Sequence, residues 1–109
     1  MTDAVALAGM PDGEHRMYGR RVTKSGSSIR LDDGTLAGSA GRMDETLRNL
    51  VIVGLPLTDA VATMTAAPAA VLGHPSGLGT LSVGDPADLL VLDDAMQVVD
   101  VLVAGTSLY

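Results

Sequence analysis

The chain contains no cysteine, tryptophan or phenylalanine, and its only aromatic residues are two tyrosines among 109 residues. The absence of cysteine excludes disulfide bonds and Cys-ligated zinc, and it makes a cytoplasmic compartment the default expectation. The shortage of aromatic side chains leaves Leu, Val, Ile, Met and Ala to fill the core. Such a core has many small contacts and few large anchors, which suits helices and strands packed within a larger assembly.

Basic residues are also few. The chain has seven Lys and Arg and thirteen Asp and Glu, which gives a formal net charge of −6. Binding to the phosphate backbone of nucleic acid needs a basic surface, so this class of partner is excluded. No apolar run approaches the roughly 20 residues that cross a bilayer, and the first residues lack the pattern of a secretory signal. We therefore expect a cytoplasmic protein that binds neither nucleic acid nor membrane.

The first third of the chain predicts turns and short strands. Residues 4–14 start apolar and become polar, which indicates a loop leaving the end of a strand. His15–Val22 and Ile29–Leu31 predict the two strands of a hairpin, joined by a turn at Lys24–Ser28. A further turn is expected at Asp32-Asp33-Gly34, so this part of the chain reads as a small sheet.

The middle of the chain predicts helices. Apolar residues at helical spacing predict a helix over residues 43–53, which Gly54 ends in the left-handed conformation. Thr58 is expected to cap a second helix, which stops before Pro68. Pro68 then begins a short third helix through Leu72.

The last third of the chain predicts strands at Leu78–Gly84, Leu89–Leu92 and Val98–Val103. The continuous apolar run Leu89–Leu92 is typical of a strand that is buried on both faces. The change from helical to β patterning predicts two domains, residues 1–75 and 76–109.

One motif in this last part resembles that of a known superfamily. The motif consists of Gly79-Thr80-Leu81, then Gly84, then Ala87-Asp88-Leu89 and further apolar residues. It is similar to the C-terminal strand motif of the amidohydrolase superfamily. In those enzymes the motif returns the chain from a metal-bearing (β/α)8 barrel to a small β-sandwich. Both this resemblance and the turn-rich sequence give Asp88 a structural role in a turn.

A second set of motifs resembles one family of that superfamily, the N-acetylglucosamine-6-phosphate deacetylases. Its members are Asp33–Ser39, Met43–Glu45, Arg48–Leu50, Thr2–Ala4 and Ala8–Gly13. The resemblance covers essentially the whole chain but only the last part of such an enzyme. It implies an α/β fragment: the last strand and C-terminal helices of a (β/α)8 metal-dependent hydrolase barrel, plus part of a small β-sandwich.

The resemblance implies an active site in which Asp3 is the catalytic residue, at the C-terminal end of the eighth barrel strand. Its carboxylate would act as general base on a metal-bound water that attacks the acetamide carbonyl, and then as acid toward the leaving amine. Leu36, Ala37 and Gly38 match the family's substrate-binding loop over the sugar, where Gly38 would allow close backbone approach. A turn leading into the next helix is equally compatible with those residues.

The implied reaction converts N-acetylglucosamine 6-phosphate to glucosamine 6-phosphate and acetate in amino-sugar catabolism, with a divalent metal ion as cofactor. The family's metal-binding Glu and two His, and its substrate-holding His and Arg, come from segments with no counterpart here. No metal ligand is therefore assigned in this chain, and the isolated chain is expected to be inactive. Met1 stands where the family usually has a small branched apolar residue such as Val, which predicts a fragment from a misplaced start, a broken gene or an incomplete assembly.

Two other functional interpretations stay open. The chain could be a non-catalytic fragment or small interaction module, which would be unstable or oligomeric because of an exposed apolar surface. If the protein behaves like the family, it forms a homo-oligomer. It could also be another amidohydrolase, such as a deaminase or dihydroorotase, although the Thr35–Ser39 segment argues against this.

The remaining candidate residues carry weaker signals. His15 and His74 have no partner at metal-ligand spacing, so solvated histidines are expected rather than ligands. Arg20-Arg21 could meet a phosphate, but an exposed strand face is the favoured interpretation. Asp93-Asp94 predicts a turn, and the six dispersed Met are expected to fill the core.

Overall fold

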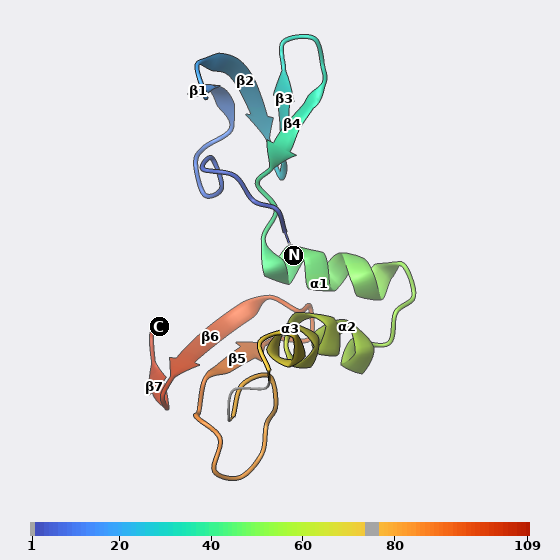
Figure 1. Ribbon diagram of the computed structural model, residues 1–109, viewed down its shortest axis with the longest axis vertical. Coiled ribbons are helices and arrows are strands. Elements are labelled where there is room, and N and C mark those ends of the chain that lie inside the picture. Colours follow the sequence, from blue (N-terminus) through green and yellow to red (C-terminus); the bar gives the residue numbers. More distant parts are fainter. Residues whose placement is uncertain (1, 74–76) are drawn as a thin grey trace. The chain divides into compact units, whose positions relative to one another are not determined.

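The computed structural model describes residues 2–73 and 77–109, and the chain forms two compact units, residues 1–46 and 47–109. Each unit contains one antiparallel sheet, and helices occupy the middle of the chain (Figure 1). The coarse prediction of a small α/β chain is therefore confirmed. The predicted domain division between residues 75 and 76 lies outside the described residues and stays a prediction.

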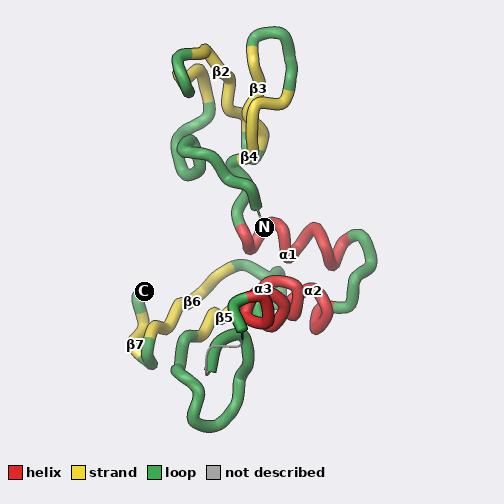
Figure 2. The backbone as a smooth tube through the Cα atoms, in the orientation of Figure 1, coloured by secondary structure: helices red, strands yellow, loops and turns green. Residues whose placement is uncertain are grey.

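The sheet of unit 1 is a four-stranded antiparallel meander in which each strand pairs with the next (Figure 2). Its strands are β1 (Gly13–Met17), β2 (Arg20–Ser25), β3 (Ser28–Leu31) and β4 (Leu36–Ser39).

The expected single strand over residues 15–22 is wrong, because the chain reverses between β1 and β2. Tyr18 and Gly19 both have positive φ, at 50° and 79°. A two-residue hairpin loop with positive φ at both positions matches the twist of the strands it joins, and glycine adopts such a conformation without steric cost. The sequence therefore encodes a hairpin where apolar residues among Arg and His predicted one half-exposed strand.

The core of unit 1 is small and aliphatic. Val22 and Ile29, from the two central strands, are 1% and 0% exposed. Leu7 and Ala40 complete the buried cluster, and the partly buried side chains packed against it are those of Val5, Met17, Leu31 and Ala37. Because so few side chains are fully buried, each of them carries a large share of the unit's stability.

Residues before the sheet are tied to its last strand. Ala4 forms an isolated parallel bridge with Ser39, and the backbone N–H of Val5 donates to the Ser39 carbonyl oxygen at 2.9 Å. The chain then turns, since the N–H of Ala8 donates to the Val5 carbonyl at 2.9 Å. The segment therefore pairs with β4 and then becomes a loop, as the sequence predicted.

Helix α1 spans Met43–Ile52 and confirms the predicted helix. Leu47 is its most buried side chain. The N–H groups of Gly54 and Leu55 donate to the carbonyl oxygens of Val51 and Leu50, both at 3.0 Å, and Gly54 has φ of 100°. This pair of hydrogen bonds is a Schellman motif, so the helix ends at the glycine as expected.

Two shorter helices follow, α2 (Leu57–Met64) and α3 (Ala66–Val71). Thr58 is not the N-cap of α2, because that position belongs to Pro56 and carries no side-chain hydrogen bond. The break between the helices falls at Thr65, and Pro68 is the third residue of α3, where its missing N–H costs no helical hydrogen bond. Within the described ranges, every helix is too short or too polar to cross a membrane.

The sheet of unit 2 contains β5 (Leu89–Leu92), β6 (Val98–Val103) and β7 (Thr106–Ser107), paired in chain order. The first two strands confirm the prediction, although Leu90 is 54% exposed, so β5 is not buried on both faces. The strand expected at Leu78–Gly84 is wrong, because that segment forms turns.

The superfamily motif that precedes β5 is held by its own side chains. The Asp85 carboxylate accepts hydrogen bonds from the Thr80 hydroxyl at 2.8 Å and the Ser82 N–H at 3.0 Å, which closes a turn where a strand was predicted. The Asp88 carboxylate accepts from the N–H of Ala104 at 2.7 Å, in the turn between β6 and β7. The expected structural role of Asp88 is therefore confirmed.

Candidate functional site

Asp3 lies on the segment that pairs with β4, one residue before the Ala4–Ser39 bridge, and its side chain is exposed. Its φ is +50°, in the left-handed region. That conformation destabilises residues with a Cβ by roughly 1–2 kcal/mol, although Asp tolerates it better than most. Such strained residues persist where neighbouring contacts hold them, and they are concentrated at functional sites.

The predicted substrate-binding residues Leu36, Ala37 and Gly38 form strand β4 rather than a loop. Leu36 is 64% exposed, whereas Ala37 packs against the core. The register pairs Ile29 with Gly38 and Arg30 with Leu36, so Ala37 is an extra residue on β4, a β-bulge. Bulges are over-represented next to active sites because they re-aim side chains and interrupt pairing.

The resemblance implied that Gly38 allows a close approach of the backbone to the sugar, and in the structure the group packed against Gly38 is the Val5 side chain. A Cβ added at Gly38 would lie 2.9 Å from Val5 Cγ1 and 3.2 Å from Val5 Cγ2. The glycine therefore leaves space for a side chain of the Asp3 segment. Binding of substrate by Leu36, Ala37 and Gly38 stays a prediction.

The structure thus brings together two segments that are more than thirty positions apart, Asp3 with its neighbours and β4. An exposed carboxylate beside a bulged strand can accept a proton from water and return it to a nearby leaving group. These are the two segments that the deacetylase motifs single out, and the bridge between Ala4 and Ser39 is what joins them.

A metal centre is not formed by the described residues. Residues 2–73 and 77–109 contain no group of three or more His, Cys, Asp or Glu that could hold an ion. The Nε2 atom of His15 lies 2.9 Å from the Pro11 carbonyl oxygen and donates to it. His74, the other histidine considered as a ligand, lies outside the described residues.

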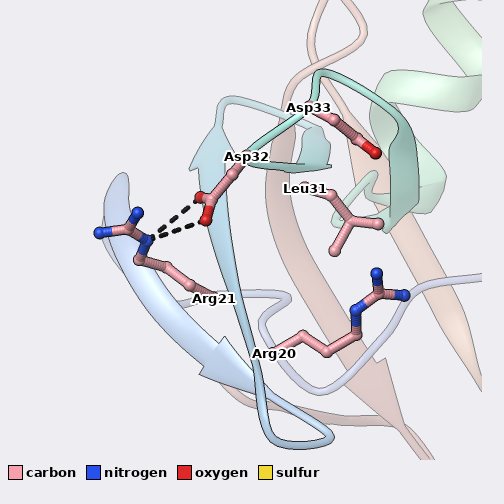
Figure 3. Close-up of a pocket in the computed structure, with 5 residues that line it drawn as sticks. All are labelled: Arg20, Arg21, Leu31, Asp32 and Asp33. Carbon is pink, nitrogen blue, oxygen red and sulfur yellow. Dashed lines mark hydrogen bonds and ion pairs between the residues drawn. The ribbon is translucent and has the colours of Figure 1, made fainter.

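A shallow hollow of about 310 Å³ lies where β2 begins and β3 ends, and it is lined by Arg20, Arg21, Leu31, Asp32 and Asp33 (Figure 3). The Nε of Arg21 donates to both oxygens of Asp32, at 3.2 and 3.1 Å, and this carboxylate raises the pKa of Arg21. Two acidic groups balance the two arginines, so the hollow offers a phosphate no excess of positive charge.

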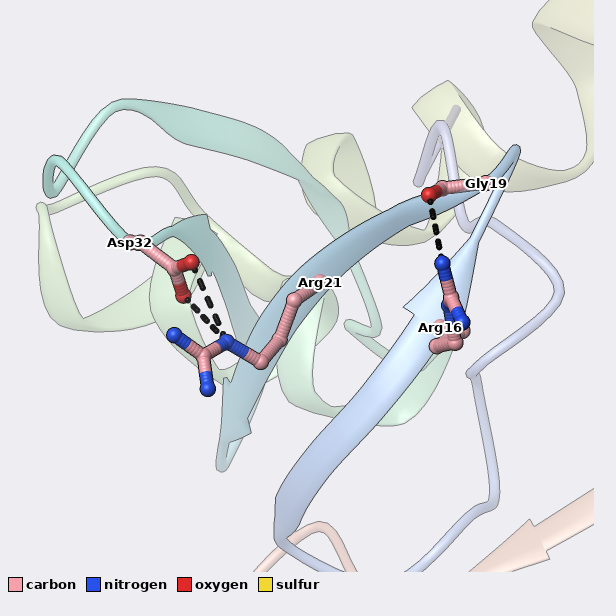
Figure 4. Close-up of polar contacts among 4 residues, drawn as sticks. All are labelled: Arg16, Gly19, Arg21 and Asp32. Carbon is pink, nitrogen blue, oxygen red and sulfur yellow. Dashed lines mark hydrogen bonds and ion pairs between the residues drawn. The ribbon is translucent and has the colours of Figure 1, made fainter.

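The surrounding polar groups brace the turns of the sheet. Asp33 accepts a hydrogen bond from the Thr35 N–H at 2.9 Å, and this bond is the main reason that the pKa of Asp33 is lowered. On the other side of β2, Arg16 Nη2 donates to the Gly19 carbonyl at 3.2 Å (Figure 4). These contacts favour the structural interpretation of Arg20-Arg21 as part of a strand face.

An ion pair that the sequence did not reveal, between buried Lys24 and exposed Asp12, lies beside the core of unit 1. Lys24 is 8% exposed, and its Nζ lies 2.6 Å from Asp12 Oδ1. Asp12 Oδ2 also accepts the Gly26 N–H at 2.9 Å. The alternation of β2 places Lys24 on the same face as buried Val22, and this spacing is the signal that could have identified it.

The Lys24 hydrogen bond, followed by that of Gly26, lowers the pKa of Asp12. Folding therefore favours the ionised carboxyl, and the resulting stability is fully present above about pH 4, the ordinary pKa of Asp. It is lost as the pH falls through the lower, folded pKa. We expect Asp12→Asn to lower the thermal unfolding midpoint at pH 7 and to flatten its decline below pH 4.

The matched control for this prediction is Asp32→Asn, which removes the partner of Arg21, a side chain that is 59% exposed. Exposed pairs contribute little to stability, so this variant is expected to unfold close to the parent temperature. Circular dichroism melts at pH 2–7 measure both effects. Equal midpoints for the two variants would contradict the role given to the Lys24–Asp12 pair.

Comparison with known proteins places this chain in a family. A model of the amidohydrolase family matches residues 17–108. The N-acetylgalactosamine-6-phosphate deacetylase of Escherichia coli O157:H7 is 35% identical over 106 residues, 96% of this chain and 28% of that protein. The N-acetylglucosamine-6-phosphate deacetylase of Caenorhabditis elegans is 33% identical over 111 residues, 100% of this chain and 27% of that protein.

Solved structures show the same likeness. The crystal structure of N-acetylglucosamine-6-phosphate deacetylase from Pasteurella multocida superposes with a TM-score of 0.84 and 31% identity, and the match covers 95% of this chain and 28% of that one. The chain thus spans less than a third of the length of these relatives. The resemblance indicated by the motifs is confirmed, and the chain belongs to the amidohydrolase family.

Proposed function

We propose that this chain supplies the proton-transfer carboxylate of an enzyme that hydrolyses N-acetylglucosamine 6-phosphate to glucosamine 6-phosphate and acetate. The observation that carries the proposal is the parallel bridge between Ala4 and Ser39. It joins the Thr2–Ala4 motif to the Asp33–Ser39 motif, so both deacetylase signatures contribute to one place. Relatives named as deacetylases of amino-sugar phosphates support the substrate class.

The chemistry assigned to this chain is proton transfer. An amide is a poor electrophile, and its nitrogen leaves readily only when protonated. In the proposal the Asp3 carboxylate takes a proton from the attacking water and then delivers it to the amine nitrogen of the sugar as the carbon–nitrogen bond breaks. Acetate and the free amino sugar phosphate are the products.

Amidohydrolases generally use a divalent metal ion, but the described residues of this chain do not form a site for one. The proposal therefore assigns no metal ligand to them and no catalytic step to the metal. In the same proposal residues 2–5 end the last strand of a (β/α)8 barrel, and β5–β7 belong to a small β-sandwich. The complete enzyme is a cytoplasmic homo-oligomer.

A second substrate is favoured by the Escherichia coli relative, which is named for N-acetylgalactosamine 6-phosphate. The two sugars differ in the configuration of one hydroxyl group, remote from the scissile amide. A second class of function, a non-catalytic interaction module, is favoured by exposed apolar side chains of unit 2, among them Val71 at 87% and Leu81 at 83%. Such surfaces mark sites where another protein surface packs.

A chimera tests the proposal. Residues 2–109 replace the matching segment of the Pasteurella multocida deacetylase, and acetate release is measured with both acetylated amino-sugar phosphates. We expect turnover that is faster with the glucosamine compound, is lost on chelation and returns with a divalent metal. The isolated chain is expected to bind less than stoichiometric metal and to release no acetate.

Three results would decide against the proposal. A folded chimera with full metal content that releases no acetate from either sugar would remove the assigned activity. Faster turnover of the galactosamine compound would show that N-acetylgalactosamine 6-phosphate, and not the glucosamine compound, is the substrate. A monomeric isolated chain that unfolds cooperatively, together with an inactive chimera, would favour the interaction module.

A further inference from the structure

We propose that Gly38 and Val5 form a positioning pair that holds Asp3 in place, and that position 38 requires glycine for this packing. The inference deepens the proposed function, on which it rests for the role of Asp3. It concerns a contact inside unit 1 that neither the motifs nor the relatives assign.

The reason for glycine at position 38 is space. Its φ lies outside the left-handed region, unlike that of eleven other glycines of the described chain, so the backbone there does not require glycine. A Cβ at Gly38 would instead meet Val5 Cγ1 at 2.9 Å, Cγ2 at 3.2 Å and Cβ at 3.6 Å. Carbon atoms do not approach to 2.9 Å in a relaxed structure, so a side chain at position 38 must displace Val5.

Val5 has little freedom to move without moving the backbone. Its N–H donates to the Ser39 carbonyl at 2.9 Å, and its own carbonyl accepts the Ala8 N–H at 2.9 Å. Its side chain packs against the buried cluster of unit 1. A displacement of Val5 therefore strains the hydrogen bond to Ser39 and the adjacent Ala4–Ser39 bridge.

Asp3 is the residue that such a displacement reaches. It stands two positions before Val5 and has φ of +50°, a conformation that a side-chain-bearing residue keeps only when its neighbours hold it. The bridge at Ala4 and the Val5–Gly38 contact are those neighbours on the C-terminal side. Since a catalytic base must lie within hydrogen-bond reach of its proton, a shift of about 1 Å lowers the rate by about 10²-fold.

The experiment compares Gly38→Ala, Val5→Ala and the double variant in the chimera described above. Gly38→Ala adds the clashing atom, and Val5→Ala removes both atoms that it would strike. We expect Gly38→Ala to lower kcat by about 10²-fold with KM nearly unchanged, and the double variant to recover most of that loss. Gly41→Ala is the matched control, because its Cβ would meet the Ser39 hydroxyl oxygen at 3.1 Å and no atom of Val5.

A second measurement does not depend on activity. In the isotope-labelled 109-residue chain, the backbone chemical shifts and the HN–Hα coupling of Asp3 report its φ. We expect Gly38→Ala to change them, the double variant to restore them, and Gly41→Ala to leave them unaltered. This readout tests the contact even when the chimera is inactive, so failure of the proposed function is distinguishable from failure of the inference.

Three outcomes would overturn the inference. If position 38 needs glycine for contact with the sugar instead of for packing, Gly38→Ala raises KM, and Val5→Ala does not rescue it. If the clash with Val5 is not what displaces Asp3, the double variant keeps the low kcat and the altered Asp3 signals of Gly38→Ala. Unfolding of Gly38→Ala that the double variant does not reverse would likewise refute the contact.

Discussion

Asp3→Asn is expected to lower kcat for acetate release in the chimera by about 10²–10⁴-fold, the usual contribution of a general acid–base group. The amide of Asn has nearly the shape of the carboxyl group but cannot take a proton from water. Asn also tolerates the left-handed conformation, so φ of +50° at position 3 does not penalise the variant. The loss should therefore reflect chemistry rather than folding.

Steady-state kinetics, metal analysis and circular dichroism on the same preparations check this prediction. KM, metal content and the spectrum should match those of the unaltered chimera. Asp94→Asn is the matched control, because Asp94 is an exposed turn residue of unit 2. A chimera that keeps its full rate with Asn at position 3 would remove Asp3 from the mechanism.

The elements that the sequence predicted well are those determined by local signals. Helix α1 follows from the spacing of Leu47, Leu50 and Val51, and its end follows from Gly54, which has φ of 100°. The Asp93-Asp94 turn is also local, since the Asp93 carboxylate accepts the Ala95 N–H at 2.9 Å. Such structures need no partner from elsewhere in the chain.

The errors arose where a side chain or a turn outweighed the local pattern. Polar and apolar residues alternate from Thr80 to Val83 as in a strand, but the Asp85 carboxylate accepts hydrogen bonds from the Thr80 hydroxyl and the Ser82 N–H. A side chain that bonds to nearby backbone offers the chain an alternative to a ladder. At Tyr18-Gly19, one glycine among charged residues was too weak a signal for a hairpin.

The arrangement of the candidate site could not be predicted from residue patterns, because its contacts are non-local. The motifs indicated that Asp3 and Leu36–Gly38 belong to one site, but a parallel bridge between Ala4 and Ser39 has no sequence signature. The Val5–Gly38 contact likewise depends on which strand lies beside the first residues. The family resemblance indicated that the two segments belong together, and the structure shows the backbone and side-chain contacts between them.

The second large effect is expected at the core of unit 1. Ile29→Ala should lower the free energy of unfolding by about 2–5 kcal/mol, the range for truncating a buried Ile when the cavity cannot fully collapse. Ile29 is 0% exposed, and the neighbouring buried side chains are aliphatic and few. Domains have only about 5–15 kcal/mol of stability in total, so this one change should leave unit 1 largely unfolded under mild denaturant.

Urea titrations followed by amide hydrogen exchange measure the effect separately in each sheet. Amides of β2 and β3 should lose protection at lower urea than in the parent, whereas Val99→Ala, in β6 with the side chain 49% exposed, should change protection little. Equal effects of the two variants would contradict the assigned core.

Because Ile29 lies opposite Gly38 in the register of β3 and β4, its loss loosens the strand that holds Val5. We therefore expect the Asp3 signals to change in Ile29→Ala before the sheet unfolds, which would show that the core of unit 1 maintains the geometry of the carboxylate proposed for proton transfer.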